Sequence, residues 1–169
     1  MNLRGQLPPP RWARELLEIS RLEAIAIFRK ERMEEPLDAY LEVFDDKLGH
    51  IEELLEATVD LTDLASKALD IVTEDRFLEV LRYLSGPPIS LDDLKVVADV
   101  EPLSPTRLKS EPDLAKRLID TVLLGLERRR FPWVSEDREP SEAERSAAAL
   151  ASAALIATRR VETSRRTEA

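Results

Sequence analysis

Prolines divide this chain into segments whose apolar residues recur at helical spacing, and this pattern restricts the fold more than any other feature. The clearest segment carries Leu37, Tyr40, Leu41, Phe44, Leu48, Ile51, Leu54 and Leu55 at steps of three and four residues. Such steps place these side chains on one stripe of an α-helix. Pro36 lies at the start of the stripe, where its missing N–H costs nothing in a first helical turn. The sequence therefore predicts a long amphipathic helix here.

The same spacing predicts further helices along the chain. A segment from Arg11 to about Met33 has a broad apolar face, and a shorter segment covers residues 64–72. Phe77 to Leu84 form another apolar pattern, which ends at the sequence SGPP. Gly86 suits the C′ position of that helix, and the two prolines after it block continuation.

Three serines followed by an acidic residue three positions later resemble capping boxes, in which each side chain satisfies a free backbone N–H at a helix start. These pairs are Ser90 with Asp93, Ser110 with Asp113, and Ser141 with Glu144. The second pair predicts a helix from about Glu111 to Arg130. With no segment typical of strands, we predict an all-α fold, an irregular multi-helix bundle of about six to seven helices with no significant sheet.

The alanine-rich segment Ala147–Ala157 has few polar residues, which predicts a central helix buried on most sides that still leaves some apolar surface open. We expect residues 1–158 to form one helical domain, with a subdivision near residues 86–90, within the sequence SGPPIS, as an alternative. Residues 159–169 have no apolar pattern of their own. They are predicted to form an arginine-rich tail.

The charge of the chain is unevenly distributed. The net charge is −9 over 169 residues, but positions 1–100 hold 12 Lys and Arg against 22 Asp and Glu, whereas positions 101–169 hold 13 against 12. Nine arginines and no lysine lie from Arg128 to Arg166. If the chain binds nucleic acid, we expect the C-terminal half to make the contacts. The alternative is that alternating Arg and Glu residues only solvate helix faces.

The remaining composition bounds the cellular setting. The chain has no cysteine, which excludes disulfides and thiolate chemistry and fits a reducing compartment. Its N-terminus has no apolar signal region, and no stretch approaches the roughly 20 consecutive apolar residues of a membrane span. We expect a soluble, cytoplasmic protein with no membrane partner.

The segment ERRRFPW, Glu127–Trp133, has two interpretations. A basic and aromatic cluster could bind nucleic acid. Alternatively, Arg128, Arg129 and Arg130 close a helix at the negative end of its dipole, while Phe131 and Trp133 fold back onto the core. We favour the second interpretation.

Residues suited to catalysis or to metal binding do not form a recognisable set. Asp45-Asp46-Lys47 and Asp93-Leu94-Lys95 spell D-x-K, and Pro112-Asp113 spells PD, but each lies on or beside a predicted helix rather than a β-hairpin. His50 is the only histidine, so no histidine metal cluster or serine triad is available. We predict no catalytic residue and no metal ligand in this chain, and a position for His50 at the edge of the core.

Several stretches together resemble the N-terminal region of the XamI family of type II restriction endonucleases. They include LPPPRW, FRKERMEEPLDAYLEVFDD, LRYLSGPPIS and, most distinctively, RRRFPWVSEDREPSEAERSAAALASAALIATRRVETSRR. The resemblance implies a Mg²⁺-dependent nuclease that cleaves DNA with a C-terminal α/β half of the PD-(D/E)xK type. We expect that half to be missing from this chain and the chain alone to be inactive.

The resemblance also implies partners. These are double-stranded DNA, the missing nuclease half and, as a further candidate, a second copy in a homodimer. The arginines favoured for phosphate contacts are Arg159, Arg160, Arg165 and Arg166, with Arg128, Arg129, Arg130 and Arg138 as secondary candidates. The alternative function is a stand-alone helical protein–protein interaction module without catalysis.

Overall fold

The computed structural model describes residues 11–30 and 35–168, with side chains over 18–30 and 36–164. Within these ranges the chain forms nine helices and no strand, which confirms the all-α prediction but exceeds the predicted count. The short helices α6 and α8 are too brief to show an apolar period. The helices are α1 (Arg11–Arg29), α2 (Glu35–Ala57), α3 (Ala68–Val72), α4 (Asp75–Leu84), α5 (Leu91–Val97), α6 (Pro105–Ser110), α7 (Pro112–Leu124), α8 (Pro132–Ser135) and α9 (Glu142–Glu168).

The chain divides into two units, Met1–Ala39 and Tyr40–Ala169. The first contains α1, whose described side chains are all exposed, including Ile19, Leu22 and Phe28. The apolar face predicted for this segment is therefore present but not buried within the unit. No helix in the described part of either unit is long and apolar enough to cross a membrane.

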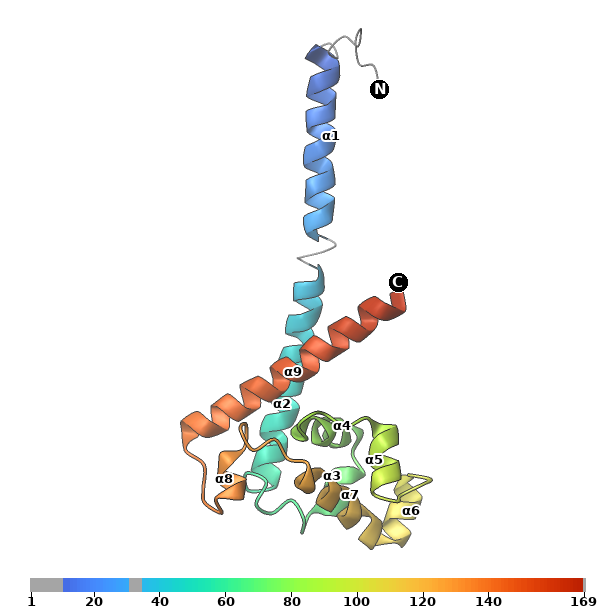
Figure 1. Cartoon of the computed structure of the whole chain (residues 1–169), viewed down its shortest axis with the longest axis vertical. Coiled ribbons are helices and arrows are strands. Elements are labelled where there is room, and N and C mark those ends of the chain that lie inside the picture. The colour runs from blue at the N-terminus through green and yellow to red at the C-terminus, as the bar shows by residue number, and fades with distance from the viewer. Residues whose placement is uncertain (1–10, 31–34, 169) are drawn as a thin grey trace, which may run out of the picture. The chain divides into compact units, whose positions relative to one another are not determined.

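The second unit holds the hydrophobic core. Helix α4 packs against α3, α5, α7 and α9, and Figure 1 shows the short helices of this unit gathered on one side of α9. The stripe predicted on α2 is buried towards its C-terminal end, where Ile51 and Leu54 are fully buried, while Leu41 near its start is exposed. The core is therefore built around the last turns of α2.

Helix α7 ends at Leu124 rather than at about Arg130, so the prediction that Arg128 to Arg130 close a helix is wrong. The chain turns at Gly125 and pairs with the end of α4 through an isolated bridge between Ser85 and Leu126. Gly86 N donates to Gly125 O at 2.8 Å, and Glu127 N donates to Leu84 O at 2.9 Å. This long-range pairing takes the place of further helical turns.

Close approach, rather than left-handed backbone, explains the two glycines at this bridge. A Cβ added at Gly86 would lie 2.4 Å from Glu127 Oε2, and one added at Gly125 would lie 2.4 Å from Ser85 Oγ. Ser85 ends α4 in an extended conformation, so Gly86 follows the helix without the left-handed geometry typical of a C′ glycine.

Two of the three predicted helix caps are present. Ser90 Oγ accepts from Asp93 N at 3.1 Å, and Ser141 with Glu144 form a reciprocal capping box with distances of 3.1 and 3.0 Å. The prediction at Ser110 is wrong, because Ser110 lies in the last turn of α6 and donates to Arg107 O. Ser104 instead caps α6, and Pro112 opens α7.

Helix α9 buries one face rather than most sides. Ala148, Ala149, Ser152, Ala153, Ile156 and Ala157 are buried, whereas Ala147, Leu150 and Ala151 on the other face are exposed. The small side chains allow close approach of the core on one face only. The helix also continues to Glu168, so the predicted tail from residue 159 is its last turns.

The prediction that Phe131 and Trp133 anchor the core is confirmed. Both side chains are fully buried and meet edge to face, with ring centroids 5.7 Å apart. Trp133 Nε1 donates to the backbone oxygen of Asp60 at 2.8 Å. Asp60 lies in a run of three non-glycine residues with positive φ, Val59 to Leu61, a costly conformation that Trp133 helps to hold.

Candidate nucleic-acid interface

The last turns of α4 and α9 line an open, basic hollow. Its volume is about 380 Å³. On α9 the lining residues follow helical spacing, as do those on α4, so each helix presents one face to the hollow. The lining residues are Glu79, Arg82, Tyr83, Arg159, Arg160, Thr163 and Ser164.

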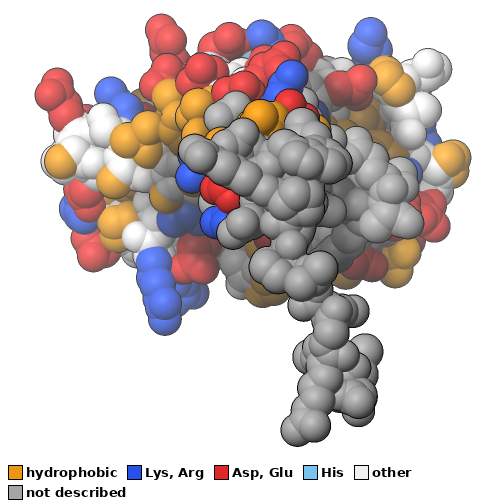
Figure 2. All heavy atoms as spheres, turned by 90° about the horizontal axis from the view of Figure 1, so that it is seen from above, with side chains coloured by type: hydrophobic (Ala, Val, Ile, Leu, Met, Phe, Trp, Pro, Cys, Tyr) orange, Lys and Arg blue, Asp and Glu red, His pale blue; other side chains and the backbone are white. Residues whose placement is uncertain are grey.

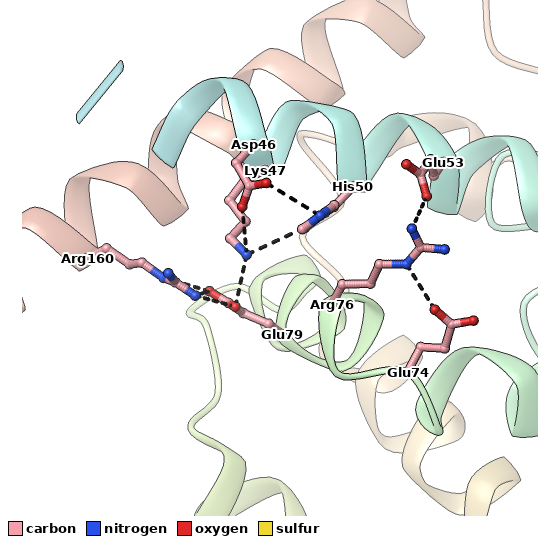
Figure 3. A network of polar contacts seen from close by, with 8 residues as sticks. All are labelled: Asp46, Lys47, His50, Glu53, Glu74, Arg76, Glu79 and Arg160. Atoms are coloured by element: carbon pink, nitrogen blue, oxygen red, sulfur yellow. Dashed lines mark hydrogen bonds and ion pairs between the residues drawn. The ribbon is translucent and has the colours of Figure 1, made fainter. Parts of the chain in front are cut away.

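Arg160 crosses from α9 to α4 and binds Glu79 through Nε and Nη2, one edge of its guanidinium. Arg160 Nε lies 2.9 Å and Nη2 lies 2.6 Å from Glu79 Oε1. Glu79 Oε2 also accepts from Lys47 Nζ of α2 at 3.2 Å. Figure 3 shows this chain of contacts, with Arg160 and Lys47 approaching the carboxylate from different helices. Glu79 therefore joins α2, α4 and α9.

The charge state of Glu79 follows from these contacts. Burial raises the pKa of this carboxyl, but the hydrogen bonds from Arg160 and Lys47, with their positive charges, outweigh burial and lower the pKa below its ordinary value. Lys47 itself is buried, with 4 % of its surface exposed. Glu79 is thus ionised at neutral pH and neutralises part of the positive charge of the hollow.

Arg159 and Arg82 are differently placed from Arg160. Arg159 is exposed, and its guanidinium has no hydrogen-bond or ion-pair partner among the described residues. The Arg82 guanidinium lies 5.5 Å from the centre of the Tyr83 ring, a cation–π contact that leaves its N–H groups available. The hollow therefore contains two guanidiniums without a carboxylate partner in the described structure.

Arg130, a secondary candidate, faces the protein instead. Its Nη2 donates to Tyr83 O at 2.6 Å and to Ser85 O at 3.5 Å, and its Nη1 donates to Ser152 Oγ at 2.8 Å. Burial lowers the pKa of this guanidinium, and the charge of Glu127 partly offsets that effect. Arg130 satisfies carbonyl groups at the end of α4 and joins that helix to α9.

The other predicted arginines fall into three groups. Arg128 and Arg129 are exposed, with no side-chain partner in the described region. Arg138 binds both oxygens of Glu144 at 2.7 Å, which raises its pKa further. Arg165 and Arg166 lie on the last turns of α9, and their side chains are outside the described residues.

A larger hollow, of about 520 Å³, lies between α2 and the start of α9. Glu52, Glu56 and Asp60 line it, and its arginine, Arg145, is engaged by Asp60, with 2.8 Å between Nε and Oδ1. An acidic lining repels phosphate. This hollow is not a candidate for nucleic-acid binding.

The D-x-K sequences do not form a nuclease site in the described structure. Lys47 uses its ammonium on Glu79 and Asp46, and Lys95 lies 3.9 Å from Asp92. No group of three or more Asp, Glu or His side chains lies together as a metal site within the described residues. These residues do not fit the Mg²⁺ that the family implies, and we derive no metal-dependent step from them.

His50 lies at the edge of the core, as predicted. Its side chain is 20 % exposed, and its Nε2 lies 3.7 Å from Asp46 Oδ1. Its Nδ1 is 3.5 Å from Lys47 Nζ. The imidazole therefore lies at the edge of the ion pairs around Lys47 rather than in a catalytic set.

Sequence reasoning missed Arg82, Lys47 and Glu79. Lys47 could have been found, because it lies three residues after Phe44 and four before Ile51, on the buried stripe of α2. A lysine at such a position requires a buried acidic partner. Nothing local in the sequence identifies Glu79 as that partner, because the pairing joins two helices.

Comparison with known proteins gives the class of protein. Residues 62–169 match the family model described as XamI restriction endonuclease. The Type II restriction enzyme XamI of Xanthomonas campestris pv. amaranthicola is 35% identical over 168 residues, covering 95% of this chain. This chain therefore belongs to the XamI restriction endonuclease family. It spans 59% of the length of that relative. No solved structure matches the chain.

Proposed function

We propose that this chain binds duplex DNA as the helical part of a type II restriction endonuclease, with phosphodiester cleavage in restriction–modification as the activity of the whole enzyme. The observation that supports this most is the 35% identity to a type II restriction enzyme across 95% of the chain. In this proposal the PD-(D/E)xK residues and their Mg²⁺ belong to the part of the family's length that this chain does not span. A cytoplasmic location remains a prediction.

Contacts to the DNA backbone are the contribution that the described residues support. Arg159 and Arg82 offer guanidinium N–H groups without carboxylate partners among the described side chains, and guanidinium forks match phosphate oxygens. Arg128 and Arg129 add exposed positive charge. Arg165 and Arg166 stay candidates on the last turns of α9. Phosphate contacts position a protein on DNA, so these arginines orient the enzyme without selecting its sequence.

The electrostatics predict that binding by this chain alone is weak. The net charge is −9, and on the visible part of the face in Figure 2 the Lys and Arg side chains lie scattered among Asp and Glu. A dispersed distribution attracts DNA less than a continuous basic stripe does. Binding of DNA should therefore involve a small part of the surface and be detectable only at low salt.

The test is fluorescence anisotropy of a labelled duplex titrated with the 169-residue chain at several KCl concentrations. Log affinity should fall linearly with log salt, with a slope of about −0.9 for each phosphate neutralised. The same chain with Mg²⁺ should leave plasmid DNA intact. Absence of binding at the lowest salt would contradict DNA binding by this chain. Cleavage that Asp93→Ala abolishes would contradict the placement of the chemistry elsewhere.

The second candidate is a protein–protein interaction module without DNA contacts. It is favoured by the exposed apolar side chains of α1, among them Ile19, Leu22, Ile27 and Phe28, each more than half exposed. The partner of this apolar face would be a second copy of the chain, in a homodimer, or a nuclease half. Sedimentation velocity of the chain distinguishes it: concentration-dependent association without DNA binding would favour this function over the first.

A further inference from the structure

We propose that the hollow between α4 and α9 binds one backbone phosphate of DNA, and that Glu79 limits its affinity by holding Arg160. The inference rests on the proposed function, because DNA supplies the phosphate. It assigns separate tasks to the cations: Arg159 and Arg82 contact the phosphate, and Arg160 joins them when it exchanges Glu79 for a phosphate oxygen.

The chemistry of the lining fits a single phosphate. Arg82, Arg159 and Arg160 supply guanidinium N–H donors, and Ser164 adds an exposed hydroxyl. A backbone phosphate offers only acceptor oxygens and a negative charge, so it can accept from these groups at once. The hollow is open enough for a phosphate on a DNA strand, with a volume of about 380 Å³.

Among the residues whose side chains the structure describes, Glu79 is the one acidic group that lines this hollow. Its carboxylate occupies the N–H groups of Arg160 at 2.9 and 2.6 Å, where a phosphate would otherwise bind. A fixed negative charge also repels an approaching phosphate. In the free protein the hollow therefore presents less positive charge than its arginines would give.

Lys47 makes the exchange of partners feasible. If Arg160 turns to a phosphate, Glu79 keeps the ammonium of Lys47 at 3.2 Å, so its carboxylate is not left buried without a cation. The side chain of Arg160 is 47 % exposed, whereas that of Lys47 is 5 % exposed. Arg160 is thus the partner that can move towards solvent, and Lys47 is the partner that stays.

The experiment compares Arg159→Ala and Glu79→Gln with the unchanged chain in the anisotropy titration. Arg159→Ala should reduce the slope of log affinity against log salt by about 0.9, the value for one lost phosphate contact. Glu79→Gln should tighten binding about two- to fivefold, the range for an ion pair whose cation is half exposed. That gain should disappear in the double variant Glu79→Gln, Arg160→Ala.

Glu53→Gln is the matched control for Glu79→Gln. Glu53 lies on α2 and pairs with Arg76 of α4, at 2.6 Å, but it does not line the hollow. Glu53→Gln removes the same unit of negative charge as Glu79→Gln. Any tightening of DNA binding that both substitutions show is therefore a general electrostatic effect. Lys116→Ala, an exposed cation on α7, is the control for Arg159→Ala. Thermal melts followed by circular dichroism establish that each variant is folded.

The outcomes separate this inference from the proposed function. If the unchanged chain binds DNA but Arg159→Ala keeps the full salt slope, or if Glu53→Gln tightens binding as much as Glu79→Gln, the hollow is not the phosphate site while DNA binding stands. If no variant binds DNA at low salt, both proposals fail. If inorganic phosphate binds the chain through Arg159, as titration calorimetry of the unchanged chain and Arg159→Ala would show, but does not displace the duplex at constant ionic strength, the hollow is a free-phosphate site and the assignment to DNA is overturned.

Discussion

The turn at Arg128–Arg130 and the end of α9 at Arg159–Arg160 are both arginine-rich, but they use arginine in different ways. Arg130 points inwards and donates to two carbonyls at the end of α4 and to Ser152. Arg159 points to solvent at the rim of a hollow. The difference teaches that the acceptors around a guanidinium, rather than the local density of arginine, decide whether it stabilises the fold or is available to a ligand.

Arg160 lies between these two cases. It is as well paired as Arg130, but its partner is a carboxylate near the surface, and it is half exposed. Among the described residues, no other side chain donates to Tyr83 O once Arg130 leaves, whereas Glu79 keeps Lys47. Only Arg160 can therefore exchange its partner without leaving a buried group unsatisfied.

The largest expected effect is on the stability of the fold, at Trp133, the buried aromatic residue beside Arg128–Arg130. Trp133→Ala should lower the free energy of unfolding by about 3–5 kcal/mol, the cost of truncating a buried aromatic residue. It also removes the hydrogen bond that holds the positive-φ run at Asp60. Urea denaturation measures the change, with Leu124→Ala, at an 88 % exposed position, as the control. An equal, small change in both would contradict the buried role of Trp133.

Arg130→Ala should come next. It removes the donor to Tyr83 O and Ser152 Oγ, and we expect a loss of about 1–3 kcal/mol, the cost of leaving buried polar groups unsatisfied. Arg129→Ala, an exposed neighbour, should change the free energy of unfolding by less than about 0.5 kcal/mol. Equal effects of the two substitutions in urea denaturation would break the comparison between structural and available arginines.

The smallest expected effect is on the pKa of Glu144, which pairs with Arg138 at the surface. Its hydrogen bonds to Glu144, with those from Ser141, lower the pKa of Glu144 to about 2. Because the folded pKa is depressed, the contribution to stability is complete above the ordinary pKa of 4.5 and is lost as the pH falls through about 2.

A carboxyl titration followed by NMR measures this shift. In Arg138→Gln the midpoint of Glu144 should move up towards its ordinary value, because the strongest donor has been removed. If the midpoint is the same in both proteins, Arg138 does not hold Glu144.

The helices and the aromatic anchor could be predicted from the sequence because their signals are local. The stripe through Ile51 and Leu54 and the capping box at Ser141 each depend on neighbours within one or two helical turns. Phe131 and Trp133 were predicted to be buried because large aromatic side chains are seldom left in water beside a fixed turn.

The end of α7 and the pairing of Arg160 in the hollow could not be predicted, because both depend on distant partners. The bridge of Leu126 to Ser85 ends the helical path at Gly125, and the pairing of Arg160 with Glu79 spans 81 residues. The sequence of an arginine run does not show whether its side chains donate to carbonyls, to carboxylates or to solvent. Only the three-dimensional contacts distinguish Arg130 from Arg159.

The most direct test of the central claim is the salt dependence of duplex binding by Arg159→Ala and Arg130→Lys, measured side by side at equal folded fraction. For each variant, the measured quantity is the slope of log affinity against log KCl concentration. We predict that Arg159→Ala loses about 0.9 of the slope while Arg130→Lys keeps it. The opposite result, a slope that falls in Arg130→Lys and is unchanged in Arg159→Ala, would contradict the assignment of the two arginine clusters.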